Sequence, residues 1–560
     1  MRFKKALLTL VPAAALLTVV SGCSSGGSAN SSSNSSSSSS SSATTMTIAT
    51  DDGSPTFQDN FNPFLAANMR KGVAWIYETL YYINSQDGKE TPWLATSYKW
   101  DTPTQLTFTI RDGVKWNDGQ PFTADDVAFT FNMLKKYPAL DTQGVWQSLD
   151  SVTASGSNVV FKFKQPDSPD FTYINIVPIV PKHVWSKVSD PTTFTNADNP
   201  VGTGAYMLDK YSPYQYTMKR NPNYWQADKI QIPELKFPAL NGADTVDLNL
   251  SKGEYDWTQA YVPDIQKTYV SKDPQNNHYW YAPSDASNIV FNDQKFPFNN
   301  VKFRQALEYG INRQELSTKG ENGYDTPADP TGLRLPGQDK YLDKSLAAQY
   351  PYEYDPQKAA QLLQSMGLKK NSSGQYVGPD GKPIEFTIIV PTGWNDWITD
   401  CNLIKDELGK IGITVDVQTP SFTTWMTNIQ SGQYGMTFTT GLNLYDPWFY
   451  YNLYLNSANA GGNGKKAHGN YENWNDPATD KLLAEYKATT DDAKKTQIIQ
   501  QLEKTMLTQV PLIPLFYNAN WNQYSTKKYE GWPDANNPYA TPSFTIPDIE
   551  MIMTHLTVKK

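Results

Sequence analysis

The sequence has 560 residues, of which 39% are hydrophobic and 19% are charged, so it is too apolar for a disordered chain. At about 150 residues per domain, this length allows roughly three domain-sized units with a sizeable core. The formal net charge of −8 argues against a nucleic-acid-binding surface.

The start of the chain has the layout of a secretory leader. Basic residues precede an apolar run over 6–20, which is too short for a comfortable membrane span. The segment VSGC at 20–23 resembles a bacterial lipobox, in which the cysteine receives a diacylglycerol before the leader is cut. We therefore expect a signal peptide over 1–22 and a lipid on Cys23. The alternative is an ordinary signal peptide that happens to end in cysteine.

A polar linker follows the expected lipid site. Residues 24–45 are almost wholly Ser, Gly, Asn, Ala and Thr, which cannot bury a core. We expect 23–45 to be a flexible, lipid-anchored linker. The chain has two cysteines, so modification of Cys23 leaves Cys401 without a disulfide partner.

The stretch 106–133 contains the densest local signals of the chain. Alternating apolar and polar residues at its start predict a half-buried strand that ends at an Asp-Gly turn. Thr123 is placed as an N-cap with Asp126 three residues later. We therefore expect a helix that begins at Ala124 and ends before Pro138.

The same stretch resembles the signature of the family 5 extracellular solute-binding proteins, the oligopeptide and dipeptide receptors of ABC importers. Over 111–127 it follows Arg-x-Gly-Val-Lys, an aromatic residue, then x-Asp-Gly-x-Pro-Phe-Thr-Ala-x-Asp-Val. The resemblance implies a two-lobed α/β fold of the periplasmic-binding-protein (Venus-flytrap) type, with an extra subdomain in the first lobe and mixed sheets flanked by helices. It also implies a monomeric receptor without a cofactor, which delivers its solute to an ABC permease and its ATPase subunits.

The resemblance extends, at uneven strength, over most of the chain after the linker. On this basis we expect a first lobe over 46–290, which includes a subdomain inserted at about 64–182. A second lobe is expected over 291–520, and 521–560 should return to the first lobe.

Two glycines in the first lobe invite a nucleotide-binding interpretation. Gly202 and Gly204 lack the third glycine and the Lys-Ser/Thr pair that phosphate-binding loops need. We expect them to permit a close approach of two backbone segments instead.

In the second lobe, 384–418 has the pattern of strand, helix and strand, which predicts part of a parallel sheet. Cys401 falls within this helix and is expected to be a buried, small apolar residue. Arg304 and Arg313 are expected to form structural ion pairs.

No pattern in the sequence identifies an enzyme. The four histidines lie far apart and form no His-x-x-x-His pair, so no zinc or other metal site is expected. The sequence contains neither a Gly-x-Ser-x-Gly elbow nor a phosphate-binding loop. The alternative hypothesis, in which the protein is an enzyme, is a secreted glycoside hydrolase, because two facing carboxylates would be enough for that catalysis.

The chain is rich in aromatic residues, with 16 Trp, 34 Tyr and 23 Phe. Many must be core, but Trp and Tyr also line ligand clefts, and 441–454 places several beside an expected loop. The candidate ligand contacts are Asn443, Tyr445, Asp446, Trp448, Trp394, Trp397, Trp425 and Trp521, together with Asn62, whose alternative role is an Asn-Pro turn.

One of these residues departs from the family's pattern. Peptide-binding members have Trp-x-x-Asp-x-x-Asp/Glu-Pro in this segment, and its first Asp pairs with the α-ammonium of the ligand. Aligned on Asp446 and Pro447, this sequence has Asn443 at that position. A neutral amide cannot supply the Coulomb attraction of a carboxylate in a closed cleft.

Oligopeptide is the ligand that the family predicts, and the departure makes an oligosaccharide its rival. The alternative is that another carboxylate, such as Asp446, anchors a peptide. In either case we expect an exported, lipid-anchored binding protein and not an enzyme.

Overall fold

The computed structural model describes residues 45–50, 55–65, 70–240, 242–442, 444–462, 464–544 and 548–560, which belong to one compact unit, Ala43–Lys560. The expected signal peptide, Cys23 and the linker up to residue 44 lie outside the described residues, as does Asn443. Among the described residues, no helix combines the length and the apolar character needed to cross a bilayer.

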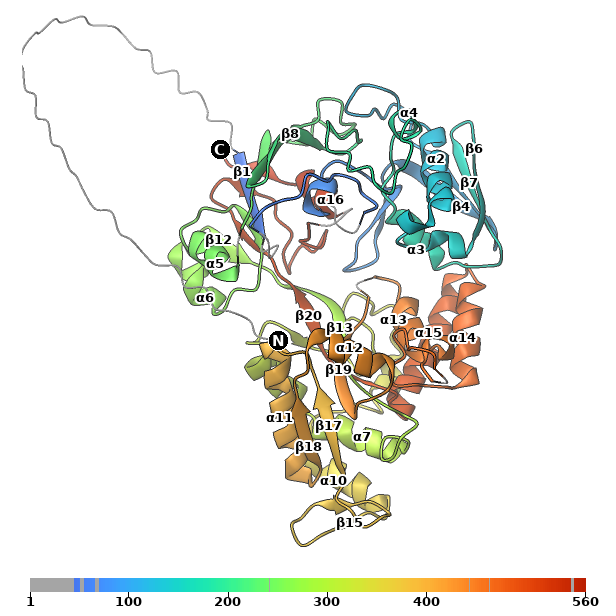
Figure 1. Cartoon of the computed structure of the whole chain (residues 1–560), viewed down its shortest axis with the longest axis vertical. Coiled ribbons are helices and arrows are strands. Elements are labelled where there is room, and N and C mark those ends of the chain that lie inside the picture. Colours follow the sequence, from blue (N-terminus) through green and yellow to red (C-terminus); the bar gives the residue numbers. More distant parts are fainter. Residues whose placement is uncertain are drawn as a thin grey trace, which may run out of the picture. The chain divides into compact units, whose positions relative to one another are not determined.

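The first lobe is built on a seven-stranded mixed sheet (Figure 1). Its central strand, β1 (Thr45–Thr50), pairs in parallel with a strand on either side, and the outer pairs are antiparallel. In sheet order the strands are β12 (Asn277–Tyr279), β21 (Gln523–Ser525), β11 (Trp257–Gln259), β1, β10 (Glu234–Pro238), β9 (Gln215–Arg220) and β8 (Tyr206–Ser212). The helices beside it are α1 (Arg70–Val73), α5 (Ala243–Ser251), α6 (Ile265–Thr268) and α16 (Asp548–Met553).

A four-stranded antiparallel sheet forms a separate subdomain of this lobe. Its order is β4 (Ala95–Thr102), β5 (Gln105–Ile110), β7 (Asn158–Phe163) and β6 (Leu149–Ser155), with α2 (Ala124–Lys136), α3 (Asp170–Asn175) and α4 (Lys182–Trp185) beside it. A short pair, β2 (Tyr81–Ile83) and β3 (Glu90–Pro92), precedes β4.

The predicted start of α2 is confirmed. The helix begins at Ala124, and the Asp126 carboxylate accepts a hydrogen bond of 2.9 Å from the Thr123 backbone N–H. The helix ends at Lys136, before Pro138.

The second lobe is built on a six-stranded mixed sheet. In order its strands are β14 (Thr326–Pro327), β20 (Ile513–Asn520), β13 (Ala282–Phe291), β19 (Met436–Thr440), β17 (Glu385–Ile389) and β18 (Thr414–Gln418). Its main helices are α7 (Val301–Gly310), α10 (Pro356–Ser365), α11 (Asn395–Ile411), α12 (Phe422–Gln430), α13 (Trp448–Leu455), α14 (Pro477–Lys487) and α15 (Asp492–Gln509).

The strand–helix–strand prediction for this lobe is confirmed. β17 and β18 pair in parallel, with α11 between them in sequence. Cys401 lies on α11 and is fully buried, as predicted.

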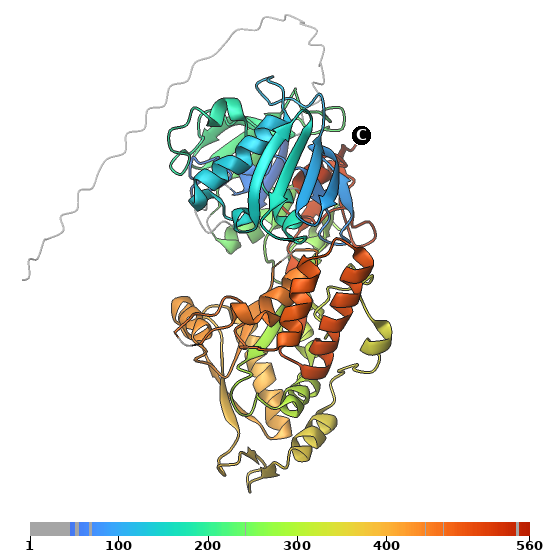
Figure 2. The same cartoon turned by 90° about the vertical axis from the view of Figure 1, so that its right-hand side faces the viewer.

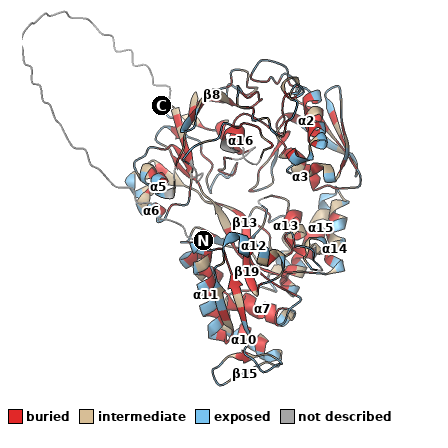
Figure 3. Cartoon of the chain, in the orientation of Figure 1, coloured by how far each residue is buried: buried red, intermediate tan, exposed pale blue. Residues whose placement is uncertain are grey.

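Two strands carry the chain between the lobes. β13 and β20 are antiparallel neighbours in the second-lobe sheet and lead directly to β12 and β21 of the first-lobe sheet (Figures 1 and 2). Each lobe has its own large core of buried apolar side chains, and a smaller one lies beside α5 and α6 (Figure 3). Two packed bodies joined by a pair of adjacent strands have the construction of a hinge.

Three further sequence predictions about the scaffold are confirmed. Arg304 pairs with Asp293 at 3.7 Å, and Arg313 pairs with Glu308; all four side chains are buried. A Cβ added at Gly202 would lie 1.9 Å from the carbonyl oxygen of Ile76, so this glycine does permit a close backbone approach.

Candidate functional site

The parallel strands of both sheets end where the two lobes join. β17, β18 and β19 run in parallel, so their carboxyl ends share one edge of the second-lobe sheet. β13 is antiparallel to β19, and Ser287 in the middle of β13 pairs with Thr440 at the end of β19, so the start of β13 lies at this edge and the chain arrives there from the first lobe. We call it the junction edge.

The first-lobe sheet is oriented in the same sense. β1 and β11 are parallel, and β21 runs antiparallel to β11, so the carboxyl ends of β1 and β11 lie where β21 begins. β21 follows β20 after Trp521 and Asn522. In open α/β sheets, ligands bind outside the carboxyl ends of the parallel strands. The junction between the lobes is therefore the candidate site.

Four aromatic side chains form a platform at the junction edge of the second lobe. Trp394 follows β17 as the N-cap residue of α11, and Phe422 is the first residue of α12 after β18. Their ring centroids are 5.9 Å apart, and Trp397 and Trp425 pack against Trp394 with centroids at 4.8 and 5.9 Å. We call these four residues the aromatic platform.

The platform has an exposed and a buried layer. Trp394 and Phe422 are 38% and 49% exposed, whereas Trp397 and Trp425 are 7% and 5% exposed. The Trp425 indole N–H donates to the Thr437 hydroxyl at 2.8 Å, which fixes that ring on β19. The buried rings thus hold the exposed ones at fixed positions, and a ligand can contact the exposed faces without a core rearrangement.

A second aromatic cluster lies between β20 and β21, where the chain passes from the second lobe back to the first. We call this segment the crossing. The Trp521 ring contacts Tyr261, Tyr281 and Tyr324, with centroids 5.3, 4.9 and 5.9 Å away. Tyr261 comes from the loop after β11 and is 41% exposed, and its hydroxyl accepts a hydrogen bond from the Asn322 side chain at 2.8 Å. Trp521 therefore joins the first lobe to a segment of the second lobe beside the hinge.

Three buried carboxyl groups lie beneath the crossing. Burial, reinforced by the Glu321 carboxyl, raises the pKa of Asp325 to about 8, and Asp325 accepts a hydrogen bond of 3.0 Å from the Ala519 N–H on β20. Burial and the same neighbour raise the pKa of Asp400. Burial thus favours the neutral form of these carboxyl groups, which makes the cluster a weaker partner for an ammonium ligand than ionised carboxylates would be.

The loop after β19 differs in its two halves. Leu442 is 44% exposed at the junction edge, and Asn443 lies outside the described residues. Tyr445 is buried and donates its hydroxyl to the Gly337 carbonyl at 3.0 Å. Asp446 accepts from the Tyr486 hydroxyl at 2.7 Å, and the Trp448 indole N–H donates to the Leu483 carbonyl at 3.1 Å. The second half of the loop is thus packed by hydrogen bonds within the second lobe, and the Tyr445 ring also lies against Gly88 of the first lobe.

Asn62, the candidate from the first lobe, is fully buried. Its amide donates to the carbonyls of Pro191 and Phe194 at 3.0 and 2.7 Å and accepts from the Phe64 N–H at 2.9 Å. Both ends of the amide are occupied by the protein, which favours the turn-forming alternative.

Of the other candidates, Trp394, Trp397 and Trp425 are brought together and Trp521 lies on the crossing, whereas Trp448 packs against α14. The sequence interpretation missed Phe422 and Tyr261. Both are aromatic residues just after a parallel strand, and that placement was the available signal. Within the described part of the chain, no group of His, Cys, Asp and Glu side chains is arranged to hold a metal ion.

Residues 89–462 match the model of the bacterial extracellular solute-binding proteins, family 5. The chain belongs to this family. The two-lobed α/β fold that the sequence predicted, with its mixed sheets flanked by helices, is thereby confirmed.

Among solved structures, the chain is similar to a periplasmic oligopeptide-binding protein of an oligopeptide ABC transporter from Thermotoga maritima. That structure is 28% identical, has a TM-score of 0.81 and covers 92% of this chain and 99% of its own. A structure of the same Thermotoga protein with mannohexaose bound has a TM-score of 0.72 at the same identity and coverage.

Curated relatives match over different lengths. The oligopeptide-binding protein of Bacillus subtilis is 23% identical over 523 residues, which are 86% of this chain and 89% of that one. Proteins named as ABC transporter peptide-binding proteins in Brucella species are 28% identical over 336 residues, and the match spans 61% of their length.

Proposed function

We propose that this chain is the extracytoplasmic substrate-binding component of an ABC importer and that it encloses an oligosaccharide between its two lobes. The observation that carries the proposal is the aromatic platform at the junction edge, where Trp394 and Phe422 expose large ring faces after the carboxyl ends of β17 and β18. The 28% identical Thermotoga protein with mannohexaose bound supports the ligand class.

The physical basis is the match between a flat aromatic face and a sugar ring. A pyranose presents C–H groups on its faces and hydroxyl groups around its edge, so an aromatic ring can cover a face while polar groups bind the edge. Contacts made to both lobes at once stabilise the closed state relative to the open one. No chemical change of the solute is needed for this role.

An oligopeptide is the second candidate. The names of the Bacillus and Brucella relatives favour it, and so does the name of the Thermotoga protein. Against it stand Asn443, at the family's acidic position, and the carboxyl groups beneath the crossing, whose burial favours their neutral form.

The remaining sequence expectations belong to the same proposal. They are a lipid on Cys23 that holds the protein at the outer face of the cell membrane, a monomeric state, a permease with ATPase subunits as partner, and lobe limits at 46–290, 291–520 and 521–560.

The test is a binding screen of residues 46–560 by thermal shift and calorimetry. Mannan, β-glucan and xylan fragments are compared with mixed peptides, and a ligand at 100 times its Kd should stabilise the protein by about 2.7 kcal/mol. Trp394→Ala and Phe422→Ala should remove sugar binding, and both variants should still unfold cooperatively without ligand. Tyr214→Ala, on the 70% exposed Tyr214 of the β8–β9 hairpin, is the control.

Binding of peptides alone would overturn the oligosaccharide assignment. Shortened sugars in the recovered ligand would instead support the glycoside hydrolase hypothesis.

A further inference from the structure

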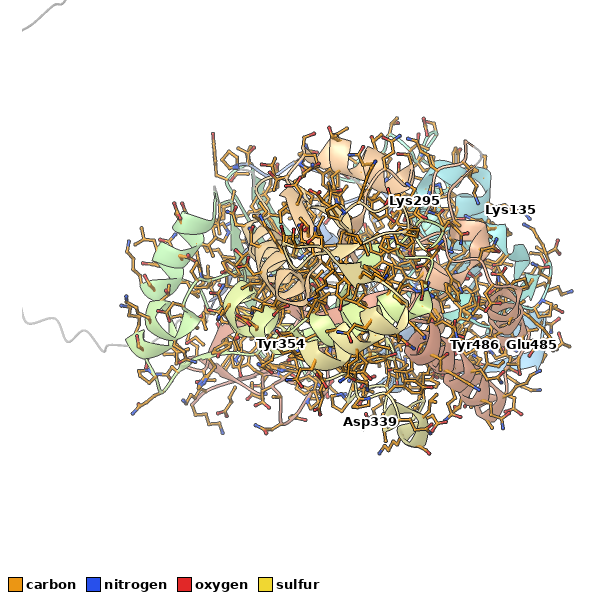
Figure 4. The ribbon with its side chains drawn as sticks, turned by 90° about the horizontal axis from the view of Figure 1, so that it is seen from below. Lys135, Lys295, Asp339, Tyr354, Glu485 and Tyr486 are labelled. Carbon is orange, nitrogen blue, oxygen red and sulfur yellow. The ribbon has the colours of Figure 1, made fainter. Side chains whose placement is uncertain are left out.

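Figures 1 and 2 show the subdomain of the first lobe next to α13, α14 and α15 of the second lobe. A pocket lies between residues of the two lobes on this flank of the molecule. Its volume is about 710 Å³, which falls within the range of small-molecule sites. Seen from below, Tyr486 of α14 and Lys135 of the subdomain lie on the same side of the unit (Figure 4). We call this hollow the flank pocket.

Aromatic side chains line the flank pocket from both lobes. Tyr98, Trp100 and Phe171 come from the first lobe, and Tyr341, Tyr445 and Tyr486 come from the second. Tyr98 and Trp100 are half-buried, whereas the other four side chains are buried and form the floor of the pocket.

Direct contacts between the lobes hold the two walls together beside the pocket. The Ser168 N–H donates to the Lys487 carbonyl at 3.0 Å, and the Lys487 ammonium lies 2.6 Å from the Asp167 carboxylate. The Tyr173 and Phe449 rings meet edge to face with centroids 4.9 Å apart. Because each contact joins different lobes, the shape of the pocket depends on how the lobes are placed.

The rim of the pocket is polar and carries charges of both signs. The Glu90 carboxylate accepts a hydrogen bond of 2.8 Å from the Tyr98 hydroxyl. Lys340 lies 5.2 Å from the centre of the Tyr445 ring, and Lys495 lies 5.0 Å from that of Tyr486. Aromatic walls below a rim of hydrogen-bonding groups suit a ring with apolar faces and hydroxyl edges.

One loop connects the flank pocket to the candidate site. The loop 441–447 leaves β19 at the junction edge, where Leu442 is exposed, and three residues later Tyr445 lines the pocket. Three residues of extended chain span at most about 11 Å, so Tyr445 at the pocket lies within about 11 Å of Leu442 at the junction edge.

We propose that the flank pocket is an outer subsite, which takes the distal units of an oligosaccharide whose inner units lie on the aromatic platform. This inference rests on the proposed function and adds the length of the ligand to it. A chain of several units that fills both places contacts the second lobe at the aromatic platform and both lobes at the flank pocket. Longer chains then favour the closed state more strongly than short ones do.

The test is a series of calorimetric titrations of the whole mature chain with mannobiose to mannohexaose, or with the corresponding glucan or xylan series if that sugar binds better. Wild type should bind the hexasaccharide at least about tenfold more tightly than the disaccharide. Two variants probe the pocket. Trp100→Ala removes a wall, and Thr490→Trp, at an exposed position of the lining, fills the space.

Both variants should lose the gain for long chains and keep the disaccharide affinity, and Tyr214→Ala should keep both. If the gain survives in both pocket variants, the outer subsite is refuted while the proposed function stands. If no sugar of any length binds to wild type, the proposed ligand class fails and the subsite fails with it.

Discussion

The ammonium group of Lys487 lies 2.6 Å from the carboxylate of Asp167, and this ion pair joins the end of α14 in the second lobe to the segment that precedes α3 in the first. The Asp167 side chain is 9% exposed and that of Lys487 is 32% exposed. The pair is therefore intermediate in burial. Surface ion pairs contribute little to stability, whereas breaking a buried ion pair is strongly destabilising.

Lys487→Met keeps the aliphatic stem and removes the charge, so it leaves Asp167 without its cation. We expect the contact between the lobes to weaken by about 1–2 kcal/mol, which corresponds to a loss of ligand affinity of about 5- to 30-fold. Small-angle scattering without ligand should show a larger radius of gyration. The matched control is Lys494→Met, at an exposed position of α15. Unchanged scattering and affinity would show that the lobes are not held at this flank.

Substitution by alanine should have opposite effects on the free energy of unfolding at Gly202 and at Gly409. At Gly202 an added Cβ would meet the Ile76 carbonyl oxygen at 1.9 Å, and that oxygen is fixed because it accepts a 2.8 Å hydrogen bond from the Gly204 N–H. Gly202→Ala should reduce the free energy of unfolding by about 3 kcal/mol or more. Gly409 lies within α11 with open space around it, so Gly409→Ala should increase it by about 0.5–1 kcal/mol. Urea denaturation measures both, and equal effects would contradict the steric argument.

The raised pKa of the buried Glu78 carboxyl should make the free energy of unfolding depend on pH. Burial raises its pKa from 4.5 to about 7, although its carboxylate accepts hydrogen bonds from the indoles of Trp93 and Trp225 at 2.6 and 3.1 Å. The folded chain therefore binds this proton more tightly than the unfolded chain does. The stabilising effect is complete below the unfolded pKa and is lost as the pH rises through the folded one.

We expect the free energy of unfolding to fall between about pH 4.5 and pH 7, by up to about 1.4 kcal/mol per pH unit for this one group. Glu78→Gln keeps the acceptor oxygen and removes the titration, so its profile should be flatter. The control is Glu353→Gln, at an exposed position. The two variants and wild type are compared by urea denaturation across this range, and parallel profiles for all three would be inconsistent with a proton held at Glu78.

Local signals determine which parts of this fold are visible in the sequence. The sequence predicts the helix that begins at Ala124 because its signals lie close together in the chain. They are the N-cap residue Thr123, its capping-box partner Asp126 and the proline that follows the helix, Pro138. The parallel pairing of β17 and β18 was predicted because a helix between two apolar strands has few alternatives. In both cases the information lies within a few residues.

The site depended on information that the sequence does not hold locally. The sequence predicts that both Trp394 and Trp448 lie in or beside loops, yet the Trp394 side chain is 38% exposed and that of Trp448 is 6% exposed. The difference arises because α14, distant in sequence, covers Trp448, while nothing comparable covers Trp394. The flank pocket combines residues from both lobes, such as Trp100 and Tyr341, which no motif connects.

The expected lipid on Cys23 predicts that the protein is attached to the cell membrane. Lipid chains on this cysteine would contribute about 0.8 kcal/mol of membrane affinity for each buried CH₂ group. Cys23→Ser should therefore release the protein from the cell envelope into the medium, as measured by immunoblotting of membrane and medium fractions. Cys401→Ser is the control, since Cys401 is buried in the second lobe and should leave the distribution unchanged. Retention of both variants in the membrane would refute the lipid assignment.

Asn443 tests the ligand class directly. In the alignment on Asp446 and Pro447, position 443 corresponds to the Asp that pairs with the α-ammonium of the ligand in peptide-binding members of the family. At 4 Å two opposite charges attract by about 4 kcal/mol at an effective dielectric constant near 20, and a neutral sugar has no positive charge with which to make such a pair. Asn443→Asp should therefore increase the affinity for a peptide with a free amino terminus by about tenfold or more, and it should give an oligosaccharide no comparable gain.

The matched ligand control is the same peptide with an acetylated amino terminus, which lacks the positive charge and should gain nothing from the substitution. Calorimetry with the two peptides and one oligosaccharide gives all the affinities on one scale. If wild type already binds the free peptide tightly and Asn443→Asp alters neither affinity, the missing carboxylate does not select the ligand. A different acidic group must then anchor the ammonium, and Asp446 would be the first to substitute.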